Sequence, residues 1–148
     1  MDDRSVNRDR LWHSLEMHVV RRDLILYLIA AGLFLLMTGE NRLIGLCLAC
    51  IGFGPFVIFH LWRTFQIFRR VEDYTFYRTK LSQFQQRFPL KTMYFTVVLE
   101  ESDGSKQVVD THAIFSSTGV VEPLVGSYVN STVTIGLNKE TGMVVVIG

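Results

Sequence analysis

The chain has no excess of charge of either sign. Its 148 residues include 15 Lys and Arg against 14 Asp and Glu, a formal net charge of +1 at pH 7. From residue 71 onwards, six basic residues stand against eight acidic ones, and they form no basic cluster. Because a module that binds nucleic acid normally carries a clustered basic face, we expect no nucleic-acid partner.

Cysteine is scarce, and its placement argues against the chemistry that it often carries. The two cysteines, Cys47 and Cys50, lie inside an apolar segment as Cys-Leu-Ala-Cys. A redox-active thiolate needs partial exposure and a helix N-terminus, and a zinc site needs further His or Cys ligands. We expect two inert packing residues, no metal and no cofactor. A redox or enzymatic role for the pair is the alternative.

A catalytic constellation is also missing. None of the four histidines stands at a recognisable spacing from a Cys or a Ser. Glu100 and Glu101 precede Asp103-Gly104, an arrangement typical of a solvated β-hairpin tip. The sequence therefore predicts that the protein is not an enzyme.

Charge is nearly absent between residues 24 and 62, where Glu40 and Arg42 are the only charged residues. Two apolar segments, 24–38 and 43–62, are joined there by a four-residue connector. A membrane-spanning helix needs about 20 apolar residues. The second segment meets this length, whereas the first reaches only about 22 Å and requires snorkelling arginines or local thinning of the bilayer. The pattern predicts a transmembrane helical hairpin; a buried hairpin in a soluble domain is the alternative.

The distribution of basic residues predicts the orientation of this hairpin. Five arginines precede the first segment, and five Lys or Arg follow the second within residues 63–80, whereas the connector carries Arg42 alone. Since Lys and Arg accumulate on the cytoplasmic side, we predict a multi-pass protein of the cell membrane with both termini in the cytoplasm. No charged residue lies in mid-span, so the hairpin by itself is not expected to be a transporter.

Small residues in the second segment indicate close helix packing. Gly45 and Ala49 are four residues apart, as are Cys50 and Gly54, and such pairs let another helix approach. The approaching helix is either the first arm of the same hairpin or a helix of an oligomer or of a membrane-protein partner. Pro55 is expected to kink the helix.

The flanks of the hairpin divide into three parts. Residues 1–23 form a cytoplasmic amphipathic arm, with Leu11, Leu15 and Val19 at four-residue spacing, lying along the membrane surface or free in solvent. Residues 63–73 form a helical linker. Residues 74–148 form a cytoplasmic β domain.

The β domain is expected to hold five short antiparallel strands. Residues 93–100 and 106–113 flank the Asp-Gly turn, with residues 97–101 pairing across it. Residues 128–137 alternate, and residues 143–147 form an unbroken apolar strand. The predicted fold is a small barrel of the OB or SH3-like kind; an open antiparallel sheet is the alternative.

One irregular stretch of this domain is unusually apolar and is our candidate for a partner-contacting loop, because binding residues concentrate in loops. A flap that covers the core is the alternative. Its candidate contact residues are Phe115, Val120, Val121, Leu124 and Val125.

Two runs, residues 95–104 and 126–146, carry a family resemblance. Across about residues 93–147 the chain resembles a broad bacterial family of membrane proteins with a small all-β domain of unknown function. It departs from the family pattern at residues 136–138, Gly-Leu-Asn, where Tyr-Asp-Pro is usual. The chain also looks somewhat like membrane-bound proteins with a C-terminal OB-type domain. Neither resemblance implies a catalytic residue.

These features favour a non-enzymatic integral membrane protein, of bacterial type. It would display its β module for protein–protein interaction, or serve as an accessory subunit of a membrane assembly. A membrane-resident immunity protein is the second hypothesis, and a redox component using Cys47 and Cys50 is the third.

Overall fold

The computed structural model describes residues 3–37, 41–87, 92–100, 104–115 and 121–148. In chain order the helices and strands are α1 (Asp3–Trp12), α2 (Leu15–Met37), α3 (Arg42–Phe68), the 3₁₀ turn η1 (Val71–Asp73), β1 (Tyr74–Lys80), β2 (Phe84–Arg87), β3 (Thr92–Glu100), β4 (Lys106–Asp110), α4 (Val121–Gly126), β5 (Thr132–Asn138) and β6 (Met143–Ile147).

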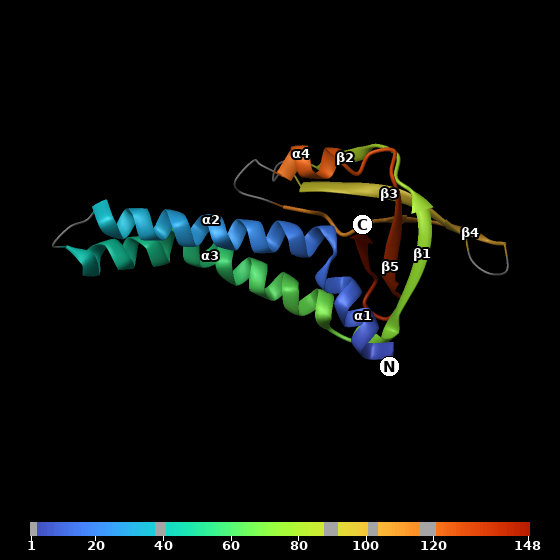
Figure 1. The fold of residues 1–148 in the computed structure, drawn as a ribbon, viewed down its shortest axis with the longest axis horizontal. Coiled ribbons are helices and arrows are strands. Elements are labelled where there is room, and N and C mark those ends of the chain that lie inside the picture. Colours follow the sequence, from blue (N-terminus) through green and yellow to red (C-terminus); the bar gives the residue numbers. More distant parts are fainter. Residues whose placement is uncertain (1–2, 38–40, 88–91, 101–103, 116–120) are drawn as a thin grey trace.

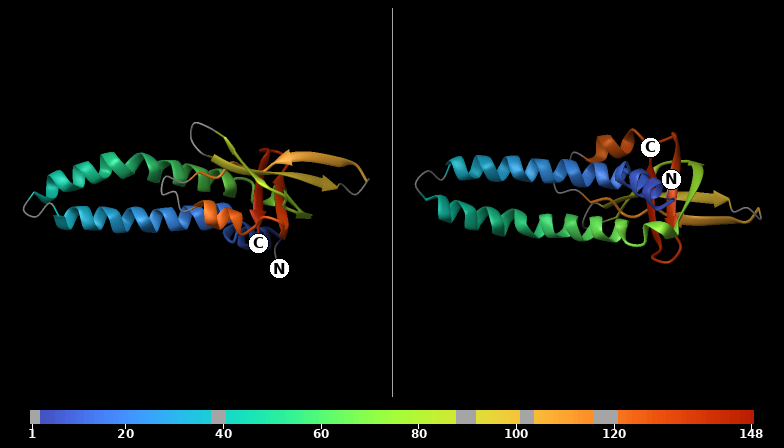
Figure 2. Two further views of the ribbon diagram at one scale, coloured as in Figure 1. Left: turned by 90° about the horizontal axis from the view of Figure 1, so that it is seen from above. Right: turned by 60° about the horizontal axis from the view of Figure 1, so that its bottom comes forward.

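Helices α2 and α3 form a long antiparallel hairpin that projects well beyond the strands (Figures 1 and 2). Both helices extend past the predicted apolar segments on the side of the β module: α2 begins at Leu15 and α3 continues to Phe68. Pro55 lies inside α3. The continuation of α3 falls within the predicted helical linker, residues 63–73, and the start of α2 falls within the predicted arm, residues 1–23. Buried residues in both parts pack with the β module, so tertiary packing sustains the helix beyond the apolar run.

Among the described residues, α3 is the one helix whose length and composition suit a membrane span. Helix α2 is interrupted by Arg21, Arg22 and Asp23, and its described part ends at Met37. Its apolar part, residues 24–37, spans about 20 Å. Length and composition thus support one spanning helix and do not by themselves support a multi-pass hairpin.

The strands form two open three-stranded antiparallel sheets, ordered β1-β5-β6 and β2-β3-β4. The open antiparallel sheet is therefore confirmed, whereas the OB or SH3-like barrel is wrong: the described strands number six and close no barrel. The outer edge of β6 is occupied by the start of α2, through a bridge between Ser14 and Ile147. A helix covers the edge that a barrel would close with a strand.

The predicted β-hairpin is confirmed, with a return strand that ends at Asp110 and not at residue 113, while Glu101 of the predicted pairing lies outside the described residues. Strands β3 and β4 pair Glu100 with Lys106 and Val97 with Val109, and Gly104 in the turn has φ +81°. After β4 the chain returns between the two sheets: the His112 amide donates to the Val144 carbonyl at 2.7 Å, and Ile114 forms a bridge with Met93. This returning segment ties the second sheet to the first.

The N-terminal arm belongs to the core of the β module. Leu11 and Leu15 are fully buried, and Val19 is nearly so. Leu15 and Val19 pack with β3, β5 and β6, while Leu11 packs with Ile67 and the other face of β6. The four-residue periodicity of the arm thus reflects a protein partner within the same chain, neither the membrane surface nor solvent.

Gly136 marks the tightest packing in the first sheet. A Cβ at this position would lie 3.1 Å from Val145 Cγ2 and 3.2 Å from ring atoms of Phe76 and Tyr74. All three neighbours are held in the sheet or its core, so they have little room to yield.

We therefore expect Gly136→Ala to lower the free energy of unfolding by about 1–3 kcal/mol, the usual cost of overpacking. Chemical unfolding in detergent, followed by circular dichroism, measures this. Gly126→Ala is the matched control, because a Cβ there meets nothing within 4 Å, and we expect its effect to stay below about 0.5 kcal/mol. Equal effects of the two substitutions contradict the packing argument.

Candidate functional site

The hairpin exposes most of the large apolar side chains that the described part of the protein leaves uncovered. Fifteen of the eighteen lie on α2 and α3, and the others are Trp12, Val98 and Val108. The exposed fraction reaches 80% at Leu36 and 85% at Met37. A soluble protein rarely leaves so large a contiguous apolar surface open to water.

The predicted helix-packing residues divide into two groups. Gly45 and Ala49 are buried, whereas Cys50 and Gly54 are more exposed, and Ala49, Cys50 and Gly54 all line the groove between α3 and α2. Cys50 is exposed and, like Cys47, is a free thiol. The Gly45–Ala49 pair therefore serves the contact between the two arms of the hairpin.

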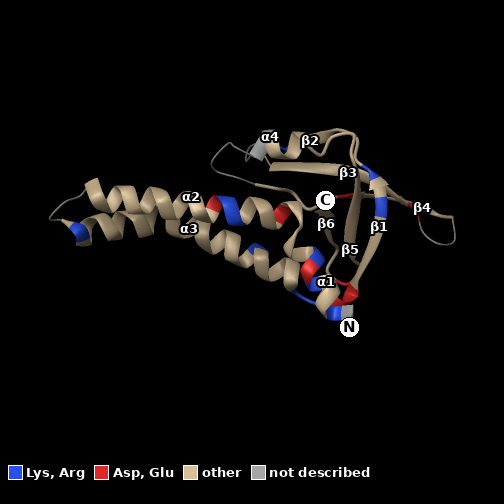
Figure 3. Cartoon of the chain, viewed as in Figure 1, with Lys and Arg blue, Asp and Glu red and all other residues tan. Residues whose placement is uncertain are grey.

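Four charged or titratable side chains, which we call the charged layer, are buried in the parts of α2 and α3 next to the β module. Figure 3 marks charged positions on both helices in this region. Glu16 and Asp23 come from α2, and His60 and Arg63 from α3; each is less than 8% exposed. His60 Nε2 lies 3.3 Å from Asp23 Oδ2. Buried charges are stable only when opposite charges or hydrogen bonds compensate them, and here two acids on one helix face two bases on the other.

The sequence carried a signal for this layer that its analysis missed. Glu16 and Asp23 are seven residues apart, and His60 and Arg63 are three apart, so each pair lies on one face of its helix. Complementary charge at helical spacing on the two arms would have pointed to a buried interface.

Glu16 attaches the hairpin to the β module. Both of its carboxylate oxygens lie 3.2 Å from the Val146 backbone nitrogen, which donates to them from the outer edge of β6. Burial raises the pKa of Glu16 to about 7, while its hydrogen bonds and the positive charge of Arg63 act in the opposite direction.

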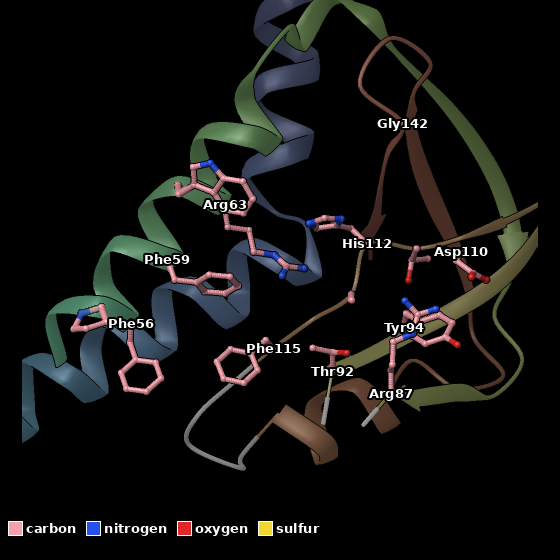
Figure 4. A pocket seen from close by; sticks show the side chains of 14 residues that line it. Phe56, Phe59, Arg63, Arg87, Thr92, Tyr94, Asp110, His112, Phe115 and Gly142 are labelled. Atoms are coloured by element: carbon pink, nitrogen blue, oxygen red, sulfur yellow. The ribbon is translucent and has the colours of Figure 1, made fainter. Parts of the chain in front are cut away.

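A cleft of about 620 Å³ opens between α3 and the second sheet, within the size range of small-molecule sites. Figure 4 shows its two ends. The aromatic end is formed by Phe56, Phe59 and Phe115, with an edge-to-face contact of 5.7 Å between Phe59 and Phe115. The polar end is formed by Arg63, Arg87, Thr92, Tyr94, Asp110 and His112.

The polar end carries two cations and one anion. Arg63 is only 7% exposed, and its Nη2 atom has no hydrogen-bond partner in the described part of the chain. Arg87 stacks on the Tyr94 ring at 5.3 Å, and Asp110 accepts a hydrogen bond from Thr96. Burial and the charge of Arg63 lower the pKa of His112 to about 4, so this imidazole is neutral at pH 7.

The predicted partner loop lies mostly in the interior where the structure describes it. Val125 is fully buried in the core, Leu124 packs against that core, and Phe115 lines the cleft. Val121 begins α4, its side chain being outside the described part, and Val120 lies outside the described residues altogether. Leu124 and Val125 thus cover the core, which agrees with the alternative prediction of a flap over the core.

Fold and site together define a two-helix hairpin with an exposed apolar surface, joined through a buried charged layer to a small two-sheet module that carries an amphipathic cleft. The chain matches no protein-family model, and neither the curated proteins nor the solved structures include a match to it. The resemblance to a bacterial membrane family therefore stays a prediction.

The pKa shifts of Glu16 and His112 act on stability in opposite directions. The folded state holds the Glu16 proton more tightly than the unfolded chain does, since the pKa rises from 4.5 to about 7, so this group lowers stability as the pH rises through that interval. The folded state releases the His112 proton more readily, its pKa falling from 6.5 to about 4, so this group lowers stability as the pH falls through that interval.

We expect Glu16→Gln to remove only the first of these dependences. The melting temperature of the variant minus that of the parent should therefore increase as the pH rises from 4.5 to 7, because a neutral amide does not titrate. Thermal unfolding in detergent across this range measures the difference. Glu100→Gln, at an exposed position at the end of β3, is the control for the loss of a surface carboxylate. A difference that changes with pH no more in Glu16→Gln than in this control contradicts the assignment.

Proposed function

We propose that the protein is a non-enzymatic integral membrane protein whose α2–α3 hairpin is embedded in the bilayer. Both termini and the β module lie on the cytoplasmic side. The module is held at the membrane surface and contacts another protein, as an accessory subunit of a membrane assembly does. The single observation that carries this proposal is the continuous exposed apolar surface of the hairpin.

The dimensions of the hairpin support this placement. Helix α3 has 27 residues and is about 40 Å long, enough to cross the hydrocarbon core. Helix α2 has a shorter apolar part, but Asp23 at its beginning is buried beside His60, which reduces the cost of placing a carboxylate near the membrane. Local thinning of the bilayer accommodates a short arm at modest cost.

The charge distribution supports the orientation. Basic residues cluster where the hairpin meets the β module, and Arg42 alone lies at the far tip (Figure 3). Because positive residues remain on the cytoplasmic side, this distribution favours an outward tip and an inward β module.

The attachment of the hairpin favours a fixed display of the module. The first turns of α2 are bound to β6 through Glu16 and the Ser14–Ile147 bridge, and Ile67 near the end of α3 is buried in the same core. Helices that continue from the membrane into the core of the module set its orientation, as an accessory subunit requires.

An exposed apolar pair offers a contact for the partner. Val98 and Val108 are direct neighbours across β3 and β4 and remain 50% and 65% exposed. They lie on the β-hairpin that projects away from α2 and α3 (Figure 1). This pair replaces the loop around residue 120 as the surface that we assign to the partner.

The orientation can be tested with cysteines at the two ends of the molecule. In a background with Cys47→Ser and Cys50→Ser, we expect Asn41→Cys, next to the hairpin tip, to react with an impermeant maleimide in intact cells. Gln107→Cys, an exposed position on β4, should react only after the cells are opened. Labelling of Gln107→Cys in intact cells contradicts the orientation, and extraction of the protein by alkaline carbonate without detergent contradicts the membrane placement.

The partner surface can be tested by site-specific photo-crosslinking in cells. We expect a photoreactive residue at Val108 to give a discrete adduct, whereas the same residue at Thr75, exposed on β1, should give none. An adduct that contains this chain alone identifies a second copy as the partner. No adduct at Val108, or equal adducts at both positions, contradicts the assignment.

A further inference from the structure

We propose that the cleft between α3 and the second sheet binds the headgroup of an anionic phospholipid, with the phosphate at Arg63 and the acyl chains leaving past the aromatic end into the bilayer. This proposal rests on the membrane placement proposed above. It goes beyond that placement by assigning a ligand and a binding site.

The first argument is the state of the Arg63 guanidinium. This side chain is more than nine-tenths buried, lines the cleft, and leaves Nη2 without a hydrogen-bond partner among the described residues. A buried charged donor that is not satisfied costs free energy. The Nη2 atom is itself enclosed by protein atoms, so an oxyanion in the cleft compensates the charge of the guanidinium from the side of Arg63 that lines the cleft. Arginine suits phosphate oxygens in particular.

The second argument is the charge of the cleft as a whole. Arg63 and Arg87 contribute two positive charges, whereas Asp110 contributes one negative charge and His112 is neutral at pH 7. Glu16 acts on Arg63 from α2, but it accepts its hydrogen bonds from Val146 and leaves the Nη2 donor unsatisfied. The polar end therefore favours a singly charged anion.

The third argument is the direction of the cleft. Its aromatic end is built from Phe56 and Phe59, which precede the cytoplasmic end of the proposed span at residue 62, and from Phe115 (Figure 4). Its polar end is built from Arg63, one helical turn beyond Phe59 on α3, and from side chains of β2, β3, β4 and the segment that follows β4. A lipid at the membrane surface has the same order of parts, apolar chains toward the bilayer and phosphate toward the cytoplasm, whereas a free phosphate would leave the aromatic end unfilled.

The chain provides its own reporter for the test. Trp62 lines the cleft, and the other tryptophan, Trp12, contacts Phe68 instead. In a Trp12→Phe variant of the full chain in detergent micelles, fluorescence reports on Trp62 alone. We expect dioctanoyl phosphatidylglycerol to give a saturable change, and dioctanoyl phosphatidylcholine to require at least about a tenfold higher concentration, since it lacks a net negative charge.

Variants made in the Trp12→Phe background test separately whether the response needs the charge of Arg63 and whether it needs the open volume of the cleft. Arg63→Gln should weaken the response to phosphatidylglycerol by about tenfold or more, the usual effect of losing a charge-assisted hydrogen bond. Ala113→Phe retains both arginines but fills the cleft, and should abolish the response. Arg78→Gln, on β1 and outside the cleft, is the matched control and should leave the response unchanged.

Three results would overturn the proposal. The first is an equal response to the two lipids, and the second is an Ala113→Phe response equal to that of the parent. The third is a response reproduced by inorganic phosphate alone, which would identify a small-anion site. The measurement in micelles does not depend on how the hairpin crosses the bilayer. Failure here therefore leaves the membrane placement standing, and failure of the cysteine labelling leaves the lipid measurement interpretable.

Discussion

The contact between Glu16 and the edge of β6 is the interaction on which the rest of the architecture depends. A carboxylate at the start of α2 accepts from the backbone amide of Val146 at the outer edge of β6, where Ser14 and His112 hold the neighbouring residues Ile147 and Val144. An unpaired edge strand is a site for aggregation, and a buried amide without an acceptor costs free energy. Glu16 supplies the acceptor for Val146 and contributes to covering the edge, and in doing so it holds the helix beside the sheet.

The charge of Glu16 in turn requires a compensating group. Arg63 on α3 provides it, so the second arm of the hairpin is held in register with the first. Asp23 and His60 repeat this arrangement farther along the same helices. Polar pairs of this kind contribute less to stability than to specificity of registry, and here they align two otherwise uniformly apolar helices that could slide past one another.

This alignment also creates the cleft. Arg63 acts electrostatically on Glu16 and also lines the cleft, so the residue that lowers the cost of the buried acid contributes its positive charge to the cavity as well. The returning segment after β4, held by the His112–Val144 hydrogen bond, forms the opposite wall. Arg63 therefore takes part both in attaching the hairpin to the β module and in the candidate ligand site.

The sequence by itself determined the features that arise from local patterns. The uninterrupted apolar run of α3 and its two small residues at four-residue spacing predicted a long helix packed against a neighbour. The Asp-Gly turn and the apolar run at residues 143–147 predicted a β-hairpin and a buried strand. In each case the residues that form the pattern are close together in the sequence, so helix or strand periodicity reveals the element.

Only the tertiary structure decided how the arm and the two sheets pack against one another. Glu16 lies 130 residues from Val146, and no periodicity connects the two positions. The open sheets, the burial of the arm and the donor of Arg63 all depend on that long-range contact. A barrel was predicted because strand patterns alone do not say whether a helix or another strand covers the last edge, and that choice depends on packing between segments far apart in the chain.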